Sequence, residues 1–297
     1  MLQFLVDTLL RASDLALIAL GLSMVYGLVI FPNIAHVQYA MFGAYVTYAM
    51  HASGVPLVLA IAISCAVTGA LTLGLHLLVF RRLLRAGPAI AMIGSLAVAM
   101  LVVAFMQGFA GSFPRMFNLP LTEPILIGEA RVTATQLYFV GTTVVLLLLF
   151  AMLLFFTRTG RAMRALASNP ALAAASGLNA EGITRGVAFA SGAIAGLGGS
   201  MLALSTGAHI NLGYDLLLPV FAAAILGGLG NPLGAVAGAL LIAATETAVT
   251  NIDFGGLVGG DPLFMPVAYI SAASFLILLL ALLFKPYGLF DREVRRV

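Results

Sequence analysis

The sequence predicts an all-α fold, a polytopic transmembrane helix bundle of about 7 to 9 membrane segments that include two broken or re-entrant helix pairs. Of the 297 residues, 62% are hydrophobic and only 8% are charged, whereas about a quarter of the residues in a soluble domain are charged. The mean hydropathy is +1.12, and uncharged runs repeatedly reach the roughly 20 residues that cross a hydrocarbon core. We therefore expect residues 1–297 to form a single transmembrane domain with the bilayer as its solvent.

Five uncharged runs have the length of one helical span each. They cover residues 55–80, 88–110, 136–156, 186–208 and 264–284. Small residues recur at four-residue spacing within the fourth of these runs and again after residue 230, a pattern that lets helix backbones approach closely in lipid. We interpret this pattern as tight packing of the bundle.

Two further runs, 15–50 and 216–252, are too long for one span, and each is interrupted near its middle. The interruptions are Phe31-Pro32-Asn33 and Gly230-Asn231-Pro232. Each run is therefore predicted to be a hairpin of two short helices or a re-entrant pair. Interrupted helices in the two halves of a transporter often mark the path of the substrate. The alternative is a Pro-Asn turn at the water interface.

The basic residues predict the orientation, because Lys and Arg concentrate in cytoplasmic loops near the ends of spans. If the three basic clusters are cytoplasmic, the loops 111–135 and 209–215 face outward, the N-terminus lies outside and the C-terminus lies inside. The clusters are Arg81, Arg82 and Arg85; Arg158, Arg161, Arg164 and Arg185; and Lys285, Arg292, Arg295 and Arg296.

Polar side chains inside apolar runs are functional hypotheses, because an unpaired charge costs at least about 2.5 kcal/mol at the bilayer centre. Glu246 follows the second break and either lines a path or is paired near the outer end of its helix. His36 follows the first break among polar neighbours and suggests a path or a hinge, whereas His76 is interpreted as a core or interfacial histidine. The candidate lining of a substrate path is Asn33, His36, Gln38, Tyr39, Asn231 and Glu246.

Several functions are excluded by what the sequence lacks. There is no G-x-x-x-x-G-K-[ST] pattern, and Lys285, the only lysine, is followed by proline, so the chain cannot bind ATP through such a loop. Cys65 is the only cysteine and the four histidines lack metal-ligand spacing, so no metal site is expected. No catalytic set is present, and the basic residues form no face for nucleic acid. We expect no enzyme activity, no bound cofactor and no nucleic-acid partner.

If transport is driven by ATP, the ATPase must be a separate subunit, and residues 157–185 are the expected docking segment. Gly160 to Ala167 is predicted to be a short helix, with two arginines on one side and Met163, Leu166 and Ala167 on the other. Asn169 is predicted to cap a second short helix that begins at Pro170, and Gly177 to end it. The alternative is a loop whose arginines only meet lipid phosphates.

Several segments, in the correct order, resemble the Liv-type permease of bacterial branched-chain amino acid ABC importers. They read ALIALGLSMVYGLV, NIAHVQYAMFGAYV, GRAMRALASNPALAAASGLN, GGLGNPLGAVAGALLIAATE and KPYGLFDR. The resemblance implies a multi-pass protein of the cytoplasmic (inner) membrane that works with a second homologous permease, two ATPase subunits that hold the ATP, and a periplasmic substrate-binding protein. It also implies a coupling helix that begins with Gly160, Arg161, Ala162, Met163, Arg164 and Ala165.

The chain departs from the family pattern after His36. Val37 and Gln38 stand where family members commonly have glycine and an acidic residue. The same machine importing urea, short amides, or aromatic and other carboxylates is therefore an open alternative. A rival of another class is an ion-coupled secondary transporter in which Glu246 or His36 carries a proton, and a third is a membrane scaffold that does not transport.

Overall fold

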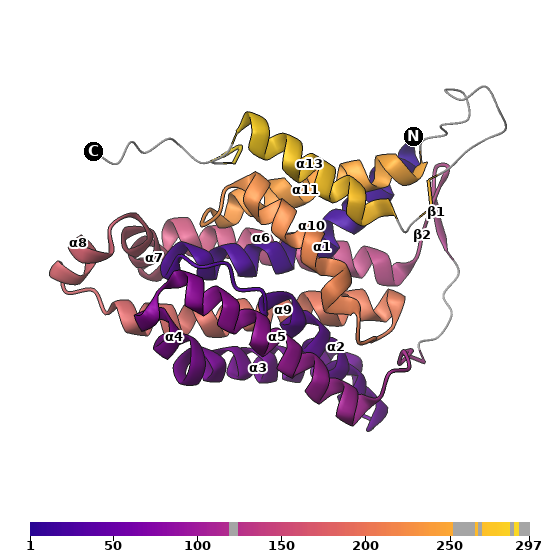
Figure 1. Ribbon diagram of the computed structural model, residues 1–297. Helices are drawn as coiled ribbons and strands as arrows, with labels where there is room; N and C mark the ends of the chain where they lie inside the picture. Colours follow the sequence, from indigo (N-terminus) through magenta and orange to yellow (C-terminus); the bar gives the residue numbers. More distant parts are fainter. Residues whose placement is uncertain (119–123, 252–264, 267–268, 286–287, 291–297) are drawn as a thin grey trace.

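The computed structural model describes residues 1–118, 124–251, 265–266, 269–285 and 288–290. Six helices in these ranges are long and apolar enough to cross a membrane, and two shorter apolar helices accompany them. They are arranged side by side in one bundle (Figure 1). The spanning helices are α1 (Leu2–Val29), the continuous segment Leu57–Ala86, α5 (Pro88–Ala110), α6 (Ala134–Phe156), α9 (Ala180–Thr206) and α11 (Pro232–Asn251). The predicted all-α bundle is confirmed.

The first broken run forms α1 and α2 (His36–Ala52), joined by the non-helical residues 30–35. Ile30 ends α1 in the left-handed conformation (φ 53°), and Pro32 cannot donate a backbone hydrogen bond. The linking segment turns back into the bundle, where α2 begins (Figure 1). The predicted break is confirmed, but the prediction of two short helices is wrong for α1, whose 28 residues span about 42 Å at 1.5 Å per residue.

The second broken run forms α10 (Leu212–Gly227) and α11, joined by a tight turn at residues 228–231. Gly228 and Gly230 take positive φ angles of 97° and 90°, which favour glycine. Asn231 caps α11, since its Oδ1 accepts the N–H of Gly234 at 3.1 Å. Here the short arm is α10 alone, because the 20 residues of α11 have the length of a full span.

The remaining predicted spans are confirmed with shifted ends. α3 (Leu57–Leu75) continues through the π-helical turn His76–Phe80 into α4 (Arg81–Ala86). α6 begins at a capping box in which Thr133 and Gln136 bond to each other's backbone N–H. Of the predicted span 264–284, the described residues form the shorter apolar helix α13 (Ile270–Phe284), and residue 264 lies outside the described residues. Between α5 and α6 a short hairpin pairs β1 (Ile125–Ile127) with β2 (Ala130–Val132).

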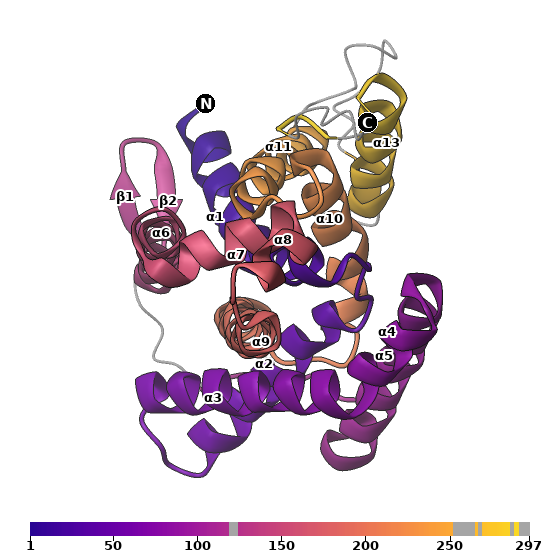
Figure 2. The same cartoon turned by 90° about the vertical axis from the view of Figure 1, so that its left-hand side faces the viewer.

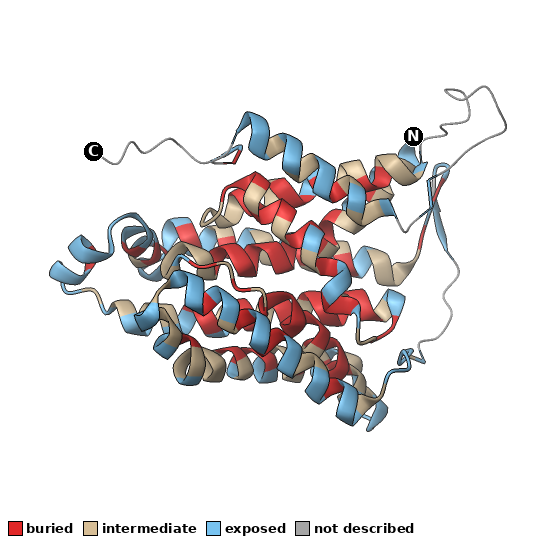
Figure 3. Cartoon of the chain, viewed as in Figure 1, coloured by how far each residue is buried: buried red, intermediate tan, exposed pale blue. Residues whose placement is uncertain are grey.

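α1 and α9 form the centre of the bundle. Of their most apolar windows, 67% and 61% are buried, against 28% for α5 and 22% for α6, and Figure 3 shows the buried residues concentrated along the middle helices. α1 packs on α11 and α9, and α9 also packs on α2 and α3. The weakly buried helices α5 and α6 therefore present apolar side chains to lipid.

The two ends of the bundle differ in charge. α4, α7 (Arg158–Ser168) and α8 (Pro170–Ala175) lie at one end, and Met1 and the β hairpin lie at the other (Figure 1). Seven arginines of the first two clusters belong to the first end, which we call the arginine-rich end: Arg81, Arg82, Arg85, Arg158, Arg161, Arg164 and Arg185. Arg292, Arg295 and Arg296 lie outside the described residues. Taken as cytoplasmic, this end places the N-terminus outside.

Candidate functional site

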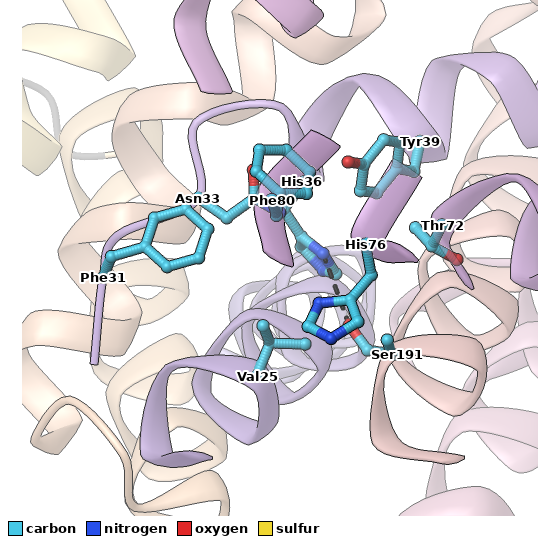
Figure 4. A pocket seen from close by; sticks show the side chains of 10 residues that line it. Val25, Phe31, Asn33, His36, Tyr39, Thr72, His76, Phe80 and Ser191 are labelled. Carbon is cyan, nitrogen blue, oxygen red and sulfur yellow. Dashed lines mark hydrogen bonds between the residues drawn. The ribbon is translucent and has the colours of Figure 1, made fainter. Parts of the chain in front are cut away.

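The first break encloses a small polar pocket. The lining includes Asn33, His36 and Tyr39, together with His76 of the π-helical turn and Ser191 of α9. The side chains of these five residues converge in Figure 4. Its volume of about 20 Å³ is only slightly more than one water molecule requires. The pocket is therefore too small, in this conformation, for an amino acid.

His36 ties three helices together. It is 1% exposed, and its Nε2 donates to the backbone carbonyl of Ile18 in α1 at 3.1 Å. Its Nδ1 lies 3.4 Å from the hydroxyl of Ser191 in α9, which itself donates to the carbonyl of Gly21 at 2.9 Å. The start of α2 is thus held by polar bonds to both central helices.

The polar neighbours of His36 have different surroundings. Asn33 Oδ1 accepts the N–H of Ala35 at 3.2 Å and so turns the chain into α2. Within the described part of the chain, the buried hydroxyl of Tyr39 and Oε1 of Gln38 have no hydrogen-bond partner. Gln38 packs against Gly213 at the start of α10, away from the pocket.

Asn231 and Glu246 lie elsewhere. Asn231 belongs to the turn before α11 and lies near Arg164 of α7 at the arginine-rich end. Glu246 is 2% exposed and lies further along α11, where Arg11 Nε donates to its Oε2 at 2.5 Å and the hydroxyl of Ser274 donates to its Oε1. Of the two alternatives for Glu246, a paired carboxylate and a residue that lines a path, the structure shows the paired carboxylate. The structure brings Asn33, His36 and Tyr39 to one pocket and does not join Gln38, Asn231 or Glu246 to them.

The predicted docking segment forms α7 and α8, which lie across the arginine-rich end of the bundle (Figure 2). Thr157 Oγ1 accepts the N–H of Gly160 and begins α7. Asn169 Oδ1 accepts the N–H of Leu172 and begins α8 with Pro170 at its first position. Gly177 follows α8 with φ at 79°. These local predictions are confirmed, and the starts of both helices follow from side-chain capping.

The faces of α7 are nearly as predicted. Met163 and Leu166 are buried, at 6% and 4% exposed, and Arg161 is exposed. Ala167, which was predicted on the same side as Met163 and Leu166, is exposed. Exposed arginine on one side and buried apolar residues on the other form an amphipathic helix.

α7 is attached rigidly to the end of α6. A Cβ added to Gly160 would lie 2.2 Å from the carbonyl oxygen of Leu153, so only glycine allows this close turn. Arg164 Nη1 donates to the carbonyl of Leu154 at 2.7 Å, and its guanidinium lies 5.2 Å from the centre of the Phe155 ring. A displacement of α7 must therefore move α6.

Comparison with known proteins agrees with this architecture. Residues 4–284 match the family model described as "Branched-chain amino acid transport system / permease component". The chain belongs to this permease family. The permease is accordingly a multi-pass protein of the cytoplasmic membrane and a transport subunit, not an enzyme.

Curated relatives match over nearly their whole length. The chain is 30% identical over 313 residues to the high-affinity branched-chain amino acid transport system permease protein BraD of Pseudomonas aeruginosa, covering 100% of the permease and 98% of the relative. It is 29% identical to the probable branched-chain amino acid transport permease protein LivH of Methanocaldococcus jannaschii, over 97% of the permease and 91% of the relative. It is 25% identical to LivH of Escherichia coli K12, with 100% and 97% covered.

One solved structure shows the same fold. PsaBC from Streptococcus pneumoniae in complex with Fab aligns with a TM-score of 0.51 and 11% identity, over 94% of the permease and 91% of that chain. At this identity the likeness concerns the helix arrangement alone.

Two residues that contact the candidate residues, Ser191 beside His36 and Arg11 beside Glu246, were not predicted from the sequence. Ser191 lies one position before the small-residue repeat of α9, and nothing local distinguishes it from other helix serines. Arg11 lies outside the three basic clusters, between Asp7 and Asp14 of the same helix. Nothing local therefore singled out Glu246 as its partner.

Proposed function

We propose that the permease forms the translocation path of an ABC importer for branched-chain or related hydrophobic amino acids, driven by separate ATPase subunits. The observation that carries the proposal is the α7–α8 pair, which lies across the arginine-rich end as an amphipathic unit clamped to α6. The family match supports the transport class. The complex would contain a second homologous permease, two ATPase subunits and a periplasmic substrate-binding protein.

The buried contacts of α7 supply a route for the movement. Met163 packs in one apolar cluster with Met24 of α1, Leu154 of α6 and Val187 of α9. α1 and α9 also carry the partners of His36, the Ile18 carbonyl and the Ser191 hydroxyl. A push on α7 by an ATPase would therefore reach the first break through packed helices, which have few alternative arrangements.

The proposed mechanism is alternating access. The pocket at the first break is closed to anything much larger than a water molecule, so transport requires α1 and α2 to separate or the break to rearrange. Non-helical backbone at membrane depth is tolerated where it is buried in protein or lines a wet cavity. In this closed form residues 31–35 are buried or half-buried in protein. Asn33, His36 and Tyr39 would become wet when the path opens.

The identity of the cargo is tested with the assembled complex. We expect the periplasmic binding protein loaded with leucine to stimulate ATP hydrolysis by the complex reconstituted in membranes. Binding protein loaded with urea, a short amide or an aromatic carboxylate is the comparison, because Val37 and Gln38 leave those solutes open. Stimulation by one of these in place of leucine would change the cargo, and no stimulation by any loaded binding protein would contradict the importer.

The docking role of α7 is tested by charge reversal at Arg161. Arg161→Glu is expected to reduce co-purification of the ATPase subunits about tenfold. In this proposal the exposed Arg161 is attracted by an acidic cleft of the ATPase, and a glutamate at the same position would be repelled by it. Arg131→Glu, at the opposite end of the bundle and equally exposed, is the matched control. If both variants retain the ATPase equally well, α7 is not the docking helix.

A further inference from the structure

A second cavity lies at the arginine-rich end, apart from the pocket at the first break. Its volume is about 230 Å³, and it lies between the end of α1, the end of α6, α7 and the turn before α11. It is lined by Met24, Gly27, Leu28, Leu154, Phe155, Met163, Arg164, Ala167, Gly230, Asn231, Pro232 and Leu233.

The chemistry of this cavity is amphiphilic. Apart from Arg164 and Asn231, every lining residue is apolar or glycine. Asn231 Nδ2 is directed to the carbonyl of Phe290 at 3.4 Å. Arg164 uses Nη1 for the Leu154 carbonyl and keeps further N–H donors, and no carboxylate in the described part of the chain pairs with it. The cavity thus offers one positive charge above an apolar wall.

The position of the cavity is at the level of lipid headgroups. α1 ends at Val29 and α6 ends at Phe156, so the cavity lies where the spanning helices leave the hydrocarbon on the arginine-rich, cytoplasmic side. α6, which forms one wall, is the least buried of the spanning helices. Phe155 and Phe156 are 51% and 78% exposed, which leaves the cavity next to lipid.

We propose that this cavity binds one anionic glycerophospholipid of the inner leaflet. The phosphate would accept hydrogen bonds from Arg164, and the first part of an acyl chain would lie against Met24, Leu28 and Leu154. A volume of about 230 Å³ is below the 300–1,000 Å³ of sites that enclose a small molecule, which suits a chain that remains partly in the bilayer. Basic pockets between membrane helices on the cytoplasmic side bind anionic headgroups in this manner.

The bound lipid would brace the proposed coupling helix. Met163, Arg164 and Ala167 belong to α7, whereas Met24 and Leu28 belong to α1 and Pro232 to α11. A lipid held here contacts all three helices, so anionic lipid would stabilise one position of α7 relative to the bundle. This consequence follows from the site and does not depend on which solute the permease carries.

The site is tested by titrating the purified full-length permease with phosphatidylglycerol and, separately, phosphatidylcholine, and counting bound lipids by native mass spectrometry. We expect phosphatidylglycerol to bind about tenfold more tightly, and Arg164→Gln to remove about tenfold of that affinity, since hydrogen bonds to charged groups have this size. Arg161→Gln, on the same helix but outside the cavity lining, should bind as the parent does.

A second pair of variants tests the apolar part without changing charge. Ala167→Phe places a ring in the cavity and should abolish tight binding, whereas Ala165→Phe, two residues away and outside the lining, should not. Equal behaviour within either pair of variants would overturn the proposal. So would displacement of the lipid by inorganic phosphate alone, which would make this a simple anion site, or equal affinity for the two lipids.

Discussion

Glu246→Gln is expected to destabilise the permease by about 3 kcal/mol, the lower end of the range for removing one partner of a buried ion pair. Glu246 is 2% exposed and its partner Arg11 is 28% exposed, so solvent relieves part of the cost of leaving Arg11 unpaired. The pair joins α1 to α11, and Ser274 extends it to α13. The measurement is the thermal unfolding of the purified protein in one detergent.

Glu181→Gln is the matched control. Glu181 also pairs with arginines, Arg81 at 2.9 Å and Arg185 at 2.5 Å, but its side chain is 46% exposed, and exposed pairs contribute little. The Glu181→Gln variant should therefore leave the unfolding temperature almost unchanged. The double variant Arg11→Gln with Glu246→Gln should recover part of the stability, because it removes both charges. A Glu246 variant as stable as the Glu181 variant would contradict a stabilising role for the pair.

The same variant separates the importer from an ion-coupled transporter. In an importer driven by ATPase subunits, any folded Glu246→Gln protein keeps uptake that depends on ATP and has no uptake driven by a pH gradient to lose. In the alternative, Glu246 carries a proton and the variant loses gradient-driven uptake. The ion pair with Arg11 favours the first outcome, because it gives Glu246 a structural role between α1 and α11.

Gly199→Ala is expected to give the second large effect. It should lower the free energy of unfolding by about 1–3 kcal/mol, as overpacking does in tight cores, or prevent folding altogether. A Cβ at Gly199 would lie 1.9 Å from the carbonyl oxygen of Ala40 and 2.4 Å from its carbonyl carbon. These are backbone atoms of α2, so α9 and α2 would have to separate. Thermal unfolding and the yield of monodisperse protein are the measurements.

Gly186→Ala in the same helix is the control. A Cβ at Gly186 meets nothing within 4 Å, and alanine favours the helix over glycine by up to about 1 kcal/mol. This variant should be as stable as the parent or slightly more stable. Equal losses from Gly186→Ala and Gly199→Ala would show that the close contact between α2 and α9 does not decide the stability.

The features that were predicted correctly depend on local rules. The break at Pro32 follows from the missing N–H of proline and the start of α8 from Asn169 and Pro170, so a short stretch of sequence contains all the information. The small-residue repeat in α9 likewise predicted close packing, and a Cβ at Gly192 or Gly196 would indeed collide with Thr72 or Thr68 of α3. The identity of the partner helix was not in the pattern.

The features that were not predicted depend on distant parts of the chain. α1 is a full span where a short helix was expected, and its Arg11 pairs with Glu246, which lies 235 positions away. Gln38 follows His36 by two residues, yet it faces α10 while His36 faces α1 and α9. Ala167 lines a cavity that α7 forms with the ends of α1 and α6 and the turn before α11, so its surroundings depend on how these distant segments pack.

The sequence by itself determined the membrane environment, the breaks between helices and the charged end, since hydropathy, capping and arginine placement act within about 20 residues. The permease family was indicated by the ordered segments that resemble the Liv-type permease. Only the tertiary structure decided which polar residues meet. It joined His36 to Ser191, paired Glu246 with Arg11 and closed the pocket at the first break. The physical reason is that an unpaired polar group in an apolar bundle costs free energy, while the crossing of helices determines which partner lies within reach.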